Sequence, residues 1–295
     1  MPTRDAPQPA DGRRAVKVVR YDGAAASVED VAAVEEPLEI RLGFELAGKP
    51  AEKSISVTMR TPGRDRELAV GFLFGEGVIE GAEEVAGFEE VAGFEEVEGE
   101  GEEDASAGNI VRVKLADGVD VDLGSLERHF YTTSSCGVCG KASIEALDMQ
   151  DCPTIPAGGM SVDPELVCEL PGRLREAQSV FEETGGIHAA GLFSPDGTLI
   201  DLQEEVGRHN AMDKLVGGQL LAGRVPLAET IVVLSGRASF ELMQKALMAH
   251  VPMVIAVGAP SSLAIDVAKS FGATLVGFAR NGRFNVYAGS ERITL

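Results

Sequence analysis

Tryptophan is absent from this chain of 295 residues, and aromatic residues together make up only 5% of it. The hydrophobic content of 44% and the charged content of 25% are nevertheless typical of packed globular proteins. These values exclude a wholly disordered or collagen-like chain and predict a core of mainly aliphatic side chains. No apolar run approaches the roughly 18 residues that a membrane-spanning helix needs, so we expect no transmembrane segment.

Basic residues are few relative to acidic ones. The chain has 26 Lys and Arg against 47 Asp and Glu, which gives a net charge of −21. Because this charge repels phosphate backbones and anionic lipid, we expect neither nucleic acid nor a membrane as a partner. The first residues also lack the apolar region of a secretory signal, so the expected location is the cytoplasm.

Only four cysteines occur, too few for a disulfide framework in a chain of this length, and cytoplasmic thiols stay reduced. Two of them, Cys136 and Cys139, form a pair in TTSSCGVCGK. A helix predicted over residues 142–147 places its amino-terminal end beside this pair, which lowers the pKa of a thiol and favours the reactive thiolate. Cys152 and Cys168 stand alone and are predicted to be core residues.

A thiolate in the CGVC sequence can attack the sulfur of a disulfide or a persulfide. A structural zinc site is disfavoured, because it needs four ligands and no second pair of this spacing occurs. A zinc deaminase is disfavoured because its His-x-Glu sequence is absent. We therefore expect no metal ligands. Sulfur transfer and thiol–disulfide exchange remain, the latter without the tryptophan that usually adjoins a thioredoxin-like pair.

The pattern of hydrophobic residues divides the chain into three parts. Residues 1–15 are expected to be a disordered tail, residues 16–105 a small α+β domain rich in strands, and residues 106–295 a larger layered α/β domain. Within the small domain, residues 80–104 carry twelve acids and no base and contain VAGFEE twice. We expect a solvated, partly disordered insertion here, with a docking surface for a basic partner as the alternative.

Alternating and apolar runs predict the elements of both domains. The small domain has predicted strands over residues 16–21, 38–42 and 54–60 and a helix over residues 65–75, with Asp65 as N-cap. Further strands are predicted over residues 110–115, 189–193, 198–202, 230–234, 253–257, 274–278 and 284–287, and helices over residues 163–177, 210–222, 240–250 and 263–270. This alternation predicts a sheet with helices on both faces.

Arginines follow glycine turns at several strand ends of this acidic chain. They are Arg208 in VGRHNAMDKL, Arg237 in SGRAS, and Arg280 and Arg283 in GFARNGRF. Because guanidinium groups and helix amino termini bind phosphate, they predict a pocket for a multiply phosphorylated ligand. A surface ion pair between Arg208 and Asp213 is the alternative for the first of them. His188, after the two glycines of TGGIHAAG, is either part of this pocket or a hydrogen-bonded structural histidine.

Taken in order, these segments resemble the FdhD family, the accessory sulfurtransferases of formate dehydrogenase. The resemblance rests on EEPLEIR, TPGRDRELAVGFLFGEGVI, TTSSCGVCGK, TGGIHAAGLF, VGRHNAMDKL, SGRASFELMQKA, APSSLA and LVGFARNGRFNVY. It extends over nearly the whole chain from about residue 35. The acidic segment at residues 80–104, the stretch at residues 202–205 and the first 15 residues do not match the pattern.

The resemblance implies a function. A cysteine desulfurase would pass sulfane sulfur to the CGVC sequence, and the sulfur would then reach the molybdenum or tungsten of a bis(molybdopterin guanine dinucleotide) cofactor. This cofactor would be a bound substrate, destined for the catalytic subunit of formate dehydrogenase. The resemblance also implies a homodimer and a larger domain similar in fold to cytidine deaminases, without their zinc.

The resemblance assigns roles to particular residues. Cys136 matches the persulfide carrier, and Cys139 matches a second cysteine that assists or resolves. With the arginine turns, it predicts these cofactor contacts: His188, Arg208, His209, Ser235, Gly236, Arg237, Phe278, Ala279, Arg280, Asn281, Gly282 and Arg283. Two other functions stay open, a non-catalytic chaperone of the molybdenum cofactor and a thiol–disulfide oxidoreductase.

Overall fold

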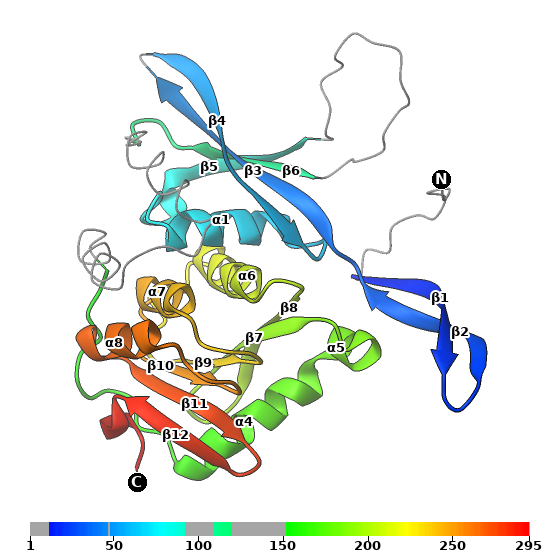
Figure 1. Cartoon of the computed structure of the whole chain (residues 1–295). Coiled ribbons are helices and arrows are strands. Elements are labelled where there is room, and N and C mark those ends of the chain that lie inside the picture. Colours follow the sequence, from blue (N-terminus) through cyan, green and yellow to red (C-terminus); the bar gives the residue numbers. More distant parts are fainter. Residues whose placement is uncertain (1–11, 47, 92–108, 120–151, 295) are drawn as a thin grey trace.

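The computed structural model describes residues 12–46, 48–91, 109–119 and 152–294 (Figure 1). In this part of the chain, the strands form a two-stranded, a four-stranded and a six-stranded sheet. None of the helices described is long and apolar enough to cross a bilayer. The predicted mixed α/β class is confirmed, whereas the likeness to cytidine deaminases stays a prediction.

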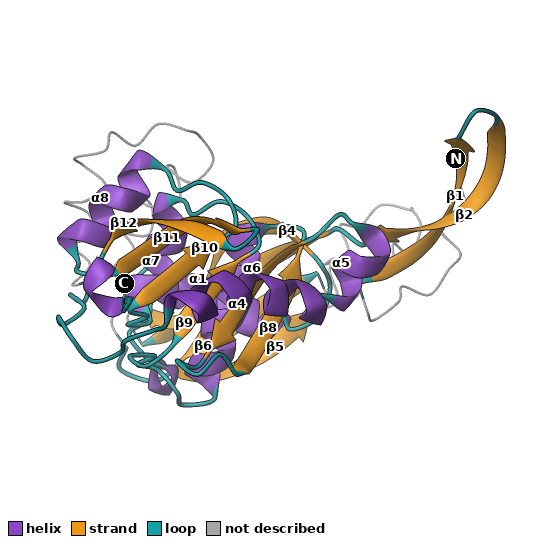
Figure 2. Cartoon of the chain, turned by 90° about the horizontal axis from the view of Figure 1, so that it is seen from below, coloured by secondary structure: helices purple, strands orange, loops and turns teal. Residues whose placement is uncertain are grey.

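The two-stranded sheet is a hairpin of β1 (Arg13–Tyr21) and β2 (Ala25–Ala33) that projects from the body of the molecule (Figure 2). The prediction of a disordered tail up to residue 15 is wrong at its end, because β1 begins at Arg13 and is paired from there. The second strand was not predicted, since AASVEDVAA is rich in alanine and has few of the residues that favour strands.

The four-stranded sheet has the order β4-β3-β6-β5, with β3 at Glu36–Leu46, β4 at Lys49–Arg60, β5 at Val85–Val91 and β6 at Ile110–Leu115. Its inner face packs on α1 (Asp65–Gly75) through aliphatic side chains such as Leu38, Ile40 and Val111. The predicted domain boundary at residue 105 stays a prediction. However, β6, which follows it, runs parallel to β3 within this sheet.

The acidic segment is not wholly a solvated insertion, and that prediction is wrong for its first part. After a 3-10 turn at Ala82–Glu84, the first VAGFEE copy forms β5, the edge strand antiparallel to β6. Phe88 packs against the core, and the Glu89 carboxylate pairs with Arg112 and Lys114 of β6. These partners lie far along the chain, so composition alone could not show them. Residues 92–104, which hold the second copy apart from its first residue, lie outside the described residues.

Helix α1 begins differently from the prediction. Its N-cap is Arg64, in the left-handed conformation with φ 55°, and not Asp65. The Asp65 carboxylate instead accepts hydrogen bonds from Nε and Nη2 of the buried Arg60, at 3.0 and 2.9 Å. A buried guanidinium needs a carboxylate partner, and this need outweighs the local preference of aspartate for the N-cap.

The six-stranded sheet has the order β12-β11-β10-β9-β7-β8, in which β9, β10 and β11 are parallel. The strands are β7 at His188–Phe193, β8 at Leu199–Glu205, β9 at Ile231–Leu234, β10 at Met253–Ala256, β11 at Thr274–Arg280 and β12 at Arg283–Ala288. Among the described residues, five further helices surround them: α4 at Pro164–Ala177, α5 at Ser179–Thr184, α6 at Arg208–Leu221, α7 at Phe240–Met248 and α8 at Ser262–Ser270. The helix predicted at residues 142–147 lies outside the described residues.

Alternate side chains of this sheet enter two hydrophobic clusters. Val232 and Val254 face the cluster that includes α6, α7 and α8, whereas Ile231 and Ile255 face the cluster that includes α4. Successive strand residues point to opposite faces, so helices cover both sides of the sheet, as predicted.

The two larger sheets are joined by the crossing of α1 and α6, which belong to one continuous core. Gly71 and Gly217 allow the two backbones to touch, because a Cβ on Gly217 would overlap the Glu67 carbonyl and lie 2.7 Å from the Gly71 amide nitrogen. Asn210 of α6 also donates to the Met59 carbonyl of β4 at 2.8 Å. The crossing therefore fixes the small sheet relative to the large one.

Candidate functional site

The turns that follow β9, β10 and β11 lie side by side at one edge of the large sheet. The Gly258 amide donates to the Gly236 carbonyl at 2.9 Å, and the Phe278 amide donates to the Gly258 carbonyl at 3.0 Å. This edge holds the carboxyl ends of the three parallel strands, where open α/β sheets bind ligands.

The turn between β11 and β12 is a two-residue loop of Asn281 and Gly282, both with positive φ. This backbone suits a hairpin between twisted strands and favours the Asn-Gly sequence. A bulge precedes it, where Phe278 also has a positive φ of 52° and the register shifts between Gly277 and Arg280. Bulges redirect side chains, and this one brings Arg280 to the sheet edge.

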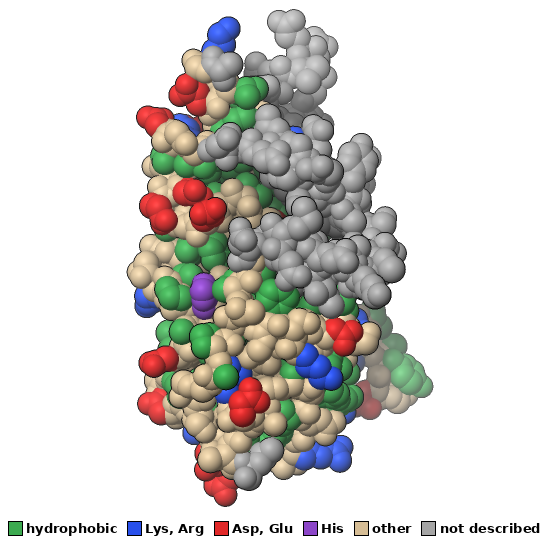
Figure 3. Space-filling model, turned by 90° about the vertical axis from the view of Figure 1, so that its left-hand side faces the viewer, with side chains coloured by type: hydrophobic (Ala, Val, Ile, Leu, Met, Phe, Trp, Pro, Cys, Tyr) green, Lys and Arg blue, Asp and Glu red, His purple; other side chains and the backbone are tan. Residues whose placement is uncertain are grey.

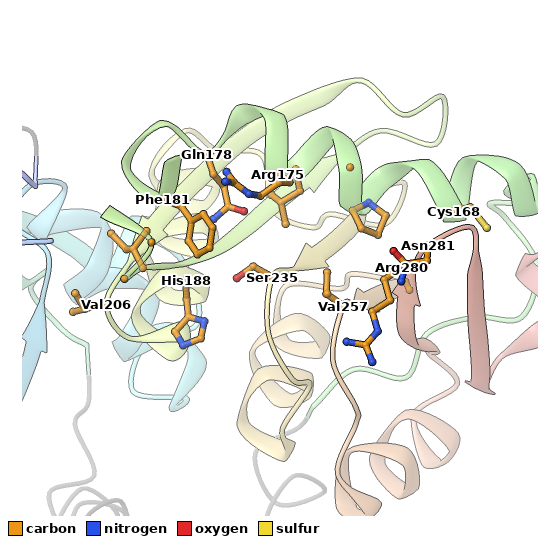
Figure 4. A pocket seen from close by; sticks show the side chains of 17 residues that line it. Cys168, Arg175, Gln178, Phe181, His188, Val206, Ser235, Val257, Arg280 and Asn281 are labelled. Atoms are coloured by element: carbon orange, nitrogen blue, oxygen red, sulfur yellow. The ribbon is translucent and has the colours of Figure 1, made fainter. Parts of the chain in front are cut away.

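A pocket of about 610 Å³ lies between this edge and helices α4 and α5 (Figure 4). Its lining comes from α4, α5, the start of β7 and the ends of β9, β10 and β11. The lining residues are Cys168, Pro171, Gly172, Leu174, Arg175, Gln178, Phe181, Gly185, Gly186, Ile187, His188, Val206, Ser235, Val257, Ala279, Arg280 and Asn281. None of them is acidic, although the chain has a large negative charge.

The structure brings five of the twelve predicted cofactor contacts into this lining: His188, Ser235, Ala279, Arg280 and Asn281. The other seven, Arg208, His209, Gly236, Arg237, Phe278, Gly282 and Arg283, do not line it. Two of these seven, Gly236 and Phe278, lie next to lining residues. A Cβ added to Gly236 would lie 3.4 Å from Nδ1 of His188, and the Phe278 ring centre lies 5.9 Å from the Arg280 guanidinium.

His188 and Ser235 lie on neighbouring strand ends. The Ser235 hydroxyl accepts a hydrogen bond from the Ala189 amide at 2.8 Å, and the Ser235 amide donates to the Ala189 carbonyl at 3.0 Å. Burial and the nearby charge of Arg208 lower the pKa of His188. At neutral pH the imidazole is therefore uncharged and can both donate and accept a hydrogen bond.

Arg208 and His209 form the first turn of α6. The buried Nε of Arg208 has no hydrogen-bond partner among the described residues. The Nε2 of His209 lies 3.2 Å from the Ser239 hydroxyl, and burial together with Arg208 lowers the pKa of His209 to about 4. Positive charge here is thus carried by Arg208 and not by the histidine.

Further along α6, two charged residues of VGRHNAMDKL belong to the fold and not to a ligand site. Asp213 pairs with Lys245 of α7 at 2.7 Å, and Lys214 pairs with Glu205 and donates to the Thr61 carbonyl at 2.8 Å. The alternative of a surface pair between Arg208 and Asp213 is therefore wrong. Five residues apart on a helix, the two side chains point in well-separated directions.

Sequence reasoning missed the contribution of α4 and α5 to the pocket. Arg175, Gln178 and Phe181 line it, and nothing in the amphipathic pattern of that segment points to a ligand. The prediction that Cys168 is a core residue is also wrong, because this free thiol is only half-buried and lines the pocket. Cys152 is buried, as predicted.

The CGVC sequence lies outside the described residues, so the positions of Cys136 and Cys139 relative to the pocket stay predictions. Within the described ranges, no group of three or more His, Cys, Asp and Glu side chains could hold a metal ion. On the face shown in Figure 3, acidic and basic side chains are interspersed, so the excess negative charge forms no single patch there.

The chain matches the model of the FdhD/NarQ family over residues 33–294. It is 50% identical to the sulfur carrier protein FdhD of Streptomyces avermitilis, over 95% of each chain. It is 46% identical to the sulfur carrier protein FdhD of Mycobacterium tuberculosis, over 89% of this chain and 91% of that one. Its fold is similar to the crystal structure of a candidate formate dehydrogenase accessory protein from Desulfotalea psychrophila, with a TM-score of 0.67 and 26% identity over 97% of this chain and 100% of that one.

Proposed function

Because the chain belongs to the FdhD/NarQ family, we propose that it is a cytoplasmic sulfur carrier that serves the maturation of formate dehydrogenase. The family membership confirms the resemblance found in the sequence. The observation that carries the proposal is the 50% identity to a sulfur carrier protein over 95% of both chains. An alignment over 95% of the chain includes the CGVC segment together with most of the fold.

The proposed donor is a cysteine desulfurase with a persulfide on its own cysteine. The Cys136 thiolate attacks the terminal sulfur of that persulfide, and the donor cysteine leaves as a thiolate, so no electrons are gained or lost. Cys139 then attacks Cys136, which releases the carried sulfur as sulfide. The resulting Cys136–Cys139 disulfide accounts for the two electrons and is reduced by a cellular thiol.

The proposed acceptor is the bis(molybdopterin guanine dinucleotide) cofactor, bound as a substrate before it enters the catalytic subunit of formate dehydrogenase. The pocket fits an anionic nucleotide, because Arg175 and Arg280 line it and no carboxylate does. The uncharged His188 and the Ser235 hydroxyl offer hydrogen bonds beside them. The homodimer and the cytidine-deaminase-like arrangement of the larger domain belong to the same proposal.

The first prediction concerns the sulfur carrier itself. After incubation with a cysteine desulfurase and free cysteine, without reductant, intact-protein mass spectrometry should show a gain of about 32 Da, one sulfur atom. Peptide mapping should place the sulfur on Cys136, and the Cys136→Ala variant should lack it. Cys168→Ala is the matched control, because Cys168 is a free thiol in the pocket lining and should not carry the sulfur.

Other results would contradict sulfur transfer. A wild-type chain that gains no sulfur on Cys136 or Cys139, yet binds the nucleotide cofactor, would act as a cofactor chaperone. The pocket favours this second candidate, because its described residues can bind an anion without any cysteine chemistry. The two functions also separate in cells, because Cys136→Ala abolishes maturation of formate dehydrogenase only for a sulfur carrier.

A further inference from the structure

The edge strand β5 has the same sequence as the residues that follow it. β5 is VAGFEEV at Val85–Val91, and residues 91–97 are again VAGFEEV. The identity also includes the two glutamates before the strand, so that residues 89–97 repeat residues 83–91 letter for letter. Every side chain that β5 presents to its neighbours therefore recurs six residues later in the sequence.

Few side chains hold β5 at the edge of the four-stranded sheet, beside β6 (Figure 1). Phe88 packs against the core, and the Arg66 guanidinium lies 5.7 Å from its ring centre. The Glu89 carboxylate pairs with Arg112 and Lys114 of β6. The second copy has a phenylalanine and a glutamate at the same two places.

The pairing of β5 with β6 is compatible with a shift of six residues. Successive side chains of a strand point to opposite faces, so an even shift returns the phenylalanine to the core face. The ladder has a bulge just before Gly87, and Gly93 is the corresponding glycine of the second copy. Ahead of the strand, the Glu84 carbonyl accepts from the Ala116 amide at 2.8 Å, and the Glu90 carbonyl takes this place after the shift.

Among the described residues, the contacts that differ between the two positions lie ahead of the strand. The 3-10 turn at Ala82–Glu84 packs Ala82 against the core, and the Glu80 amide donates to the Glu84 carboxylate at 2.7 Å. A shift would break both contacts, which favours the register described. The linker from α1 would gain six residues and the linker to β6 would lose six. Because closure entropy changes slowly with length, these two changes nearly cancel.

We propose that β5 exchanges between two registers, in which one or the other copy of VAGFEEV occupies the edge of the sheet. The major register is the one described, with Phe88 in the core. The other register places Phe94 against the core and Glu95 beside Arg112, with a population of roughly 0.1–10%. Residues 85–90 then join the linker that follows α1. The duplication thus keeps the edge of β6 covered in both states, and this exchange is independent of the proposed function.

Carbodiimide coupling of the full chain tests the exchange, because it joins the Lys114 ammonium to a carboxylate in contact with it. Peptide mapping should find Lys114 joined mainly to Glu89, its partner in the major register, with a minor product at Glu95. Phe88→Ala weakens the major register alone and should raise the ratio of the Glu95 product to the Glu89 product about tenfold or more. Phe94→Ala should remove the Glu95 product.

Melting temperatures supply an independent measurement. Phe94→Ala should leave the melting temperature unchanged, whereas Phe88→Ala should lower it less than the double variant does, because Phe94 replaces Phe88. The double variant removes the ring from both registers and should melt about 5 °C lower or more. Phe44→Ala is the matched control, since Phe44 of β3 is also partly buried against the core. It should lower the melting temperature and leave the ratio of coupling products unchanged.

Several results would overturn the inference. Equal melting temperatures of Phe88→Ala and the double variant would show that the second copy does not replace the first, as would a Glu95 product missing from both the wild type and Phe88→Ala. A Glu95 product that persists in Phe94→Ala would mean that Lys114 reaches this carboxylate without a shift of the strand. A Glu95 product confined to covalent dimers would place the second copy on the sheet of another chain. None of these outcomes affects the test of sulfur transfer.

Discussion

The crossing of α1 and α6 and the pocket at the sheet edge both bury charged or polar side chains, with opposite results. At the crossing, Asp213 pairs with Lys245 and Glu205 pairs with Lys214. At the pocket, the Nε2 of Gln178 has no hydrogen-bond partner within the described residues, and the lining holds no carboxylate for its arginines. Burial of a polar group is therefore common to both regions, and the missing partner is what distinguishes a ligand site from the fold.

The largest expected effect concerns the crossing. Gly217→Ala places a Cβ 2.7 Å from the Gly71 amide nitrogen and in overlap with the Glu67 carbonyl, both backbone atoms that cannot move aside. We expect the free energy of unfolding in denaturant to fall by about 4 kcal/mol or more, since the helices must separate.

Gly218→Ala is the matched control for this variant. The Cβ of residue 218 would meet the guanidinium end of Arg64, which is flexible and can turn away. The unfolding free energy should then change by less than about 1 kcal/mol, because alanine is also the better helix former. Equal losses in the two variants would show that the backbone contact does not control the crossing.

The second effect is a pH dependence of the unfolding free energy that arises from Asp213, the buried carboxylate paired with Lys245. Burial raises the pKa of Asp213 to about 6, against an ordinary value of 3.8, although Lys245 opposes this shift. The folded chain therefore binds a proton at this site more tightly than the unfolded chain. This contribution to stability is present at low pH and is lost as pH rises from about 4 to 6.

Asp213→Asn isolates this contribution, because asparagine does not titrate and all other groups are shared. The unfolding free energy of the wild type minus that of the variant should fall by up to about 3 kcal/mol between pH 4 and pH 7. Denaturant unfolding at several pH values measures it. A difference that grows with pH would mean that Lys245 and not burial dominates at Asp213.

Elements that depend on local sequence patterns can be predicted from the sequence, whereas elements that depend on distant partners cannot. Unbroken apolar runs and helical periodicity are local signals, so they predict the parallel strands β9, β10 and β11 and the helices between them. Strand β5 follows from Phe88 in the core and Glu89 beside Arg112, contacts that the sequence does not display. Edge strands depend on such distant partners more than central, fully apolar strands do.

The residues of the pocket also fall into two groups, those that a local sequence pattern indicates and those that only the folded structure brings together. Arg280 and Asn281 were predicted, because the Asn-Gly turn and the arginine beside it are visible in sequence. Gln178 was not, because an unpaired amide is defined by what surrounds it in space. Asp213 shows the converse, since its place in the same motif as Arg208 suggested a surface pair with that residue, whereas its partner is the distant Lys245 of α7.

The smallest effect on stability is expected at the pocket, with Arg280→Gln. Apart from the Phe278 ring at 5.9 Å, no described residue holds the Arg280 guanidinium, so the unfolding free energy should change by less than about 0.5 kcal/mol. GDP affinity measured by calorimetry should nevertheless fall about tenfold, because a charge-assisted contact to phosphate is lost.

Arg173→Gln is the control variant and should show the opposite pattern. Arg173 pairs with Glu169 at 2.7 Å and donates to the Gly197 carbonyl at 2.8 Å, so its loss should cost about 1 kcal/mol of stability and leave GDP binding intact. If Arg280→Gln cost stability and spared binding, the missing partner would no longer mark the ligand site.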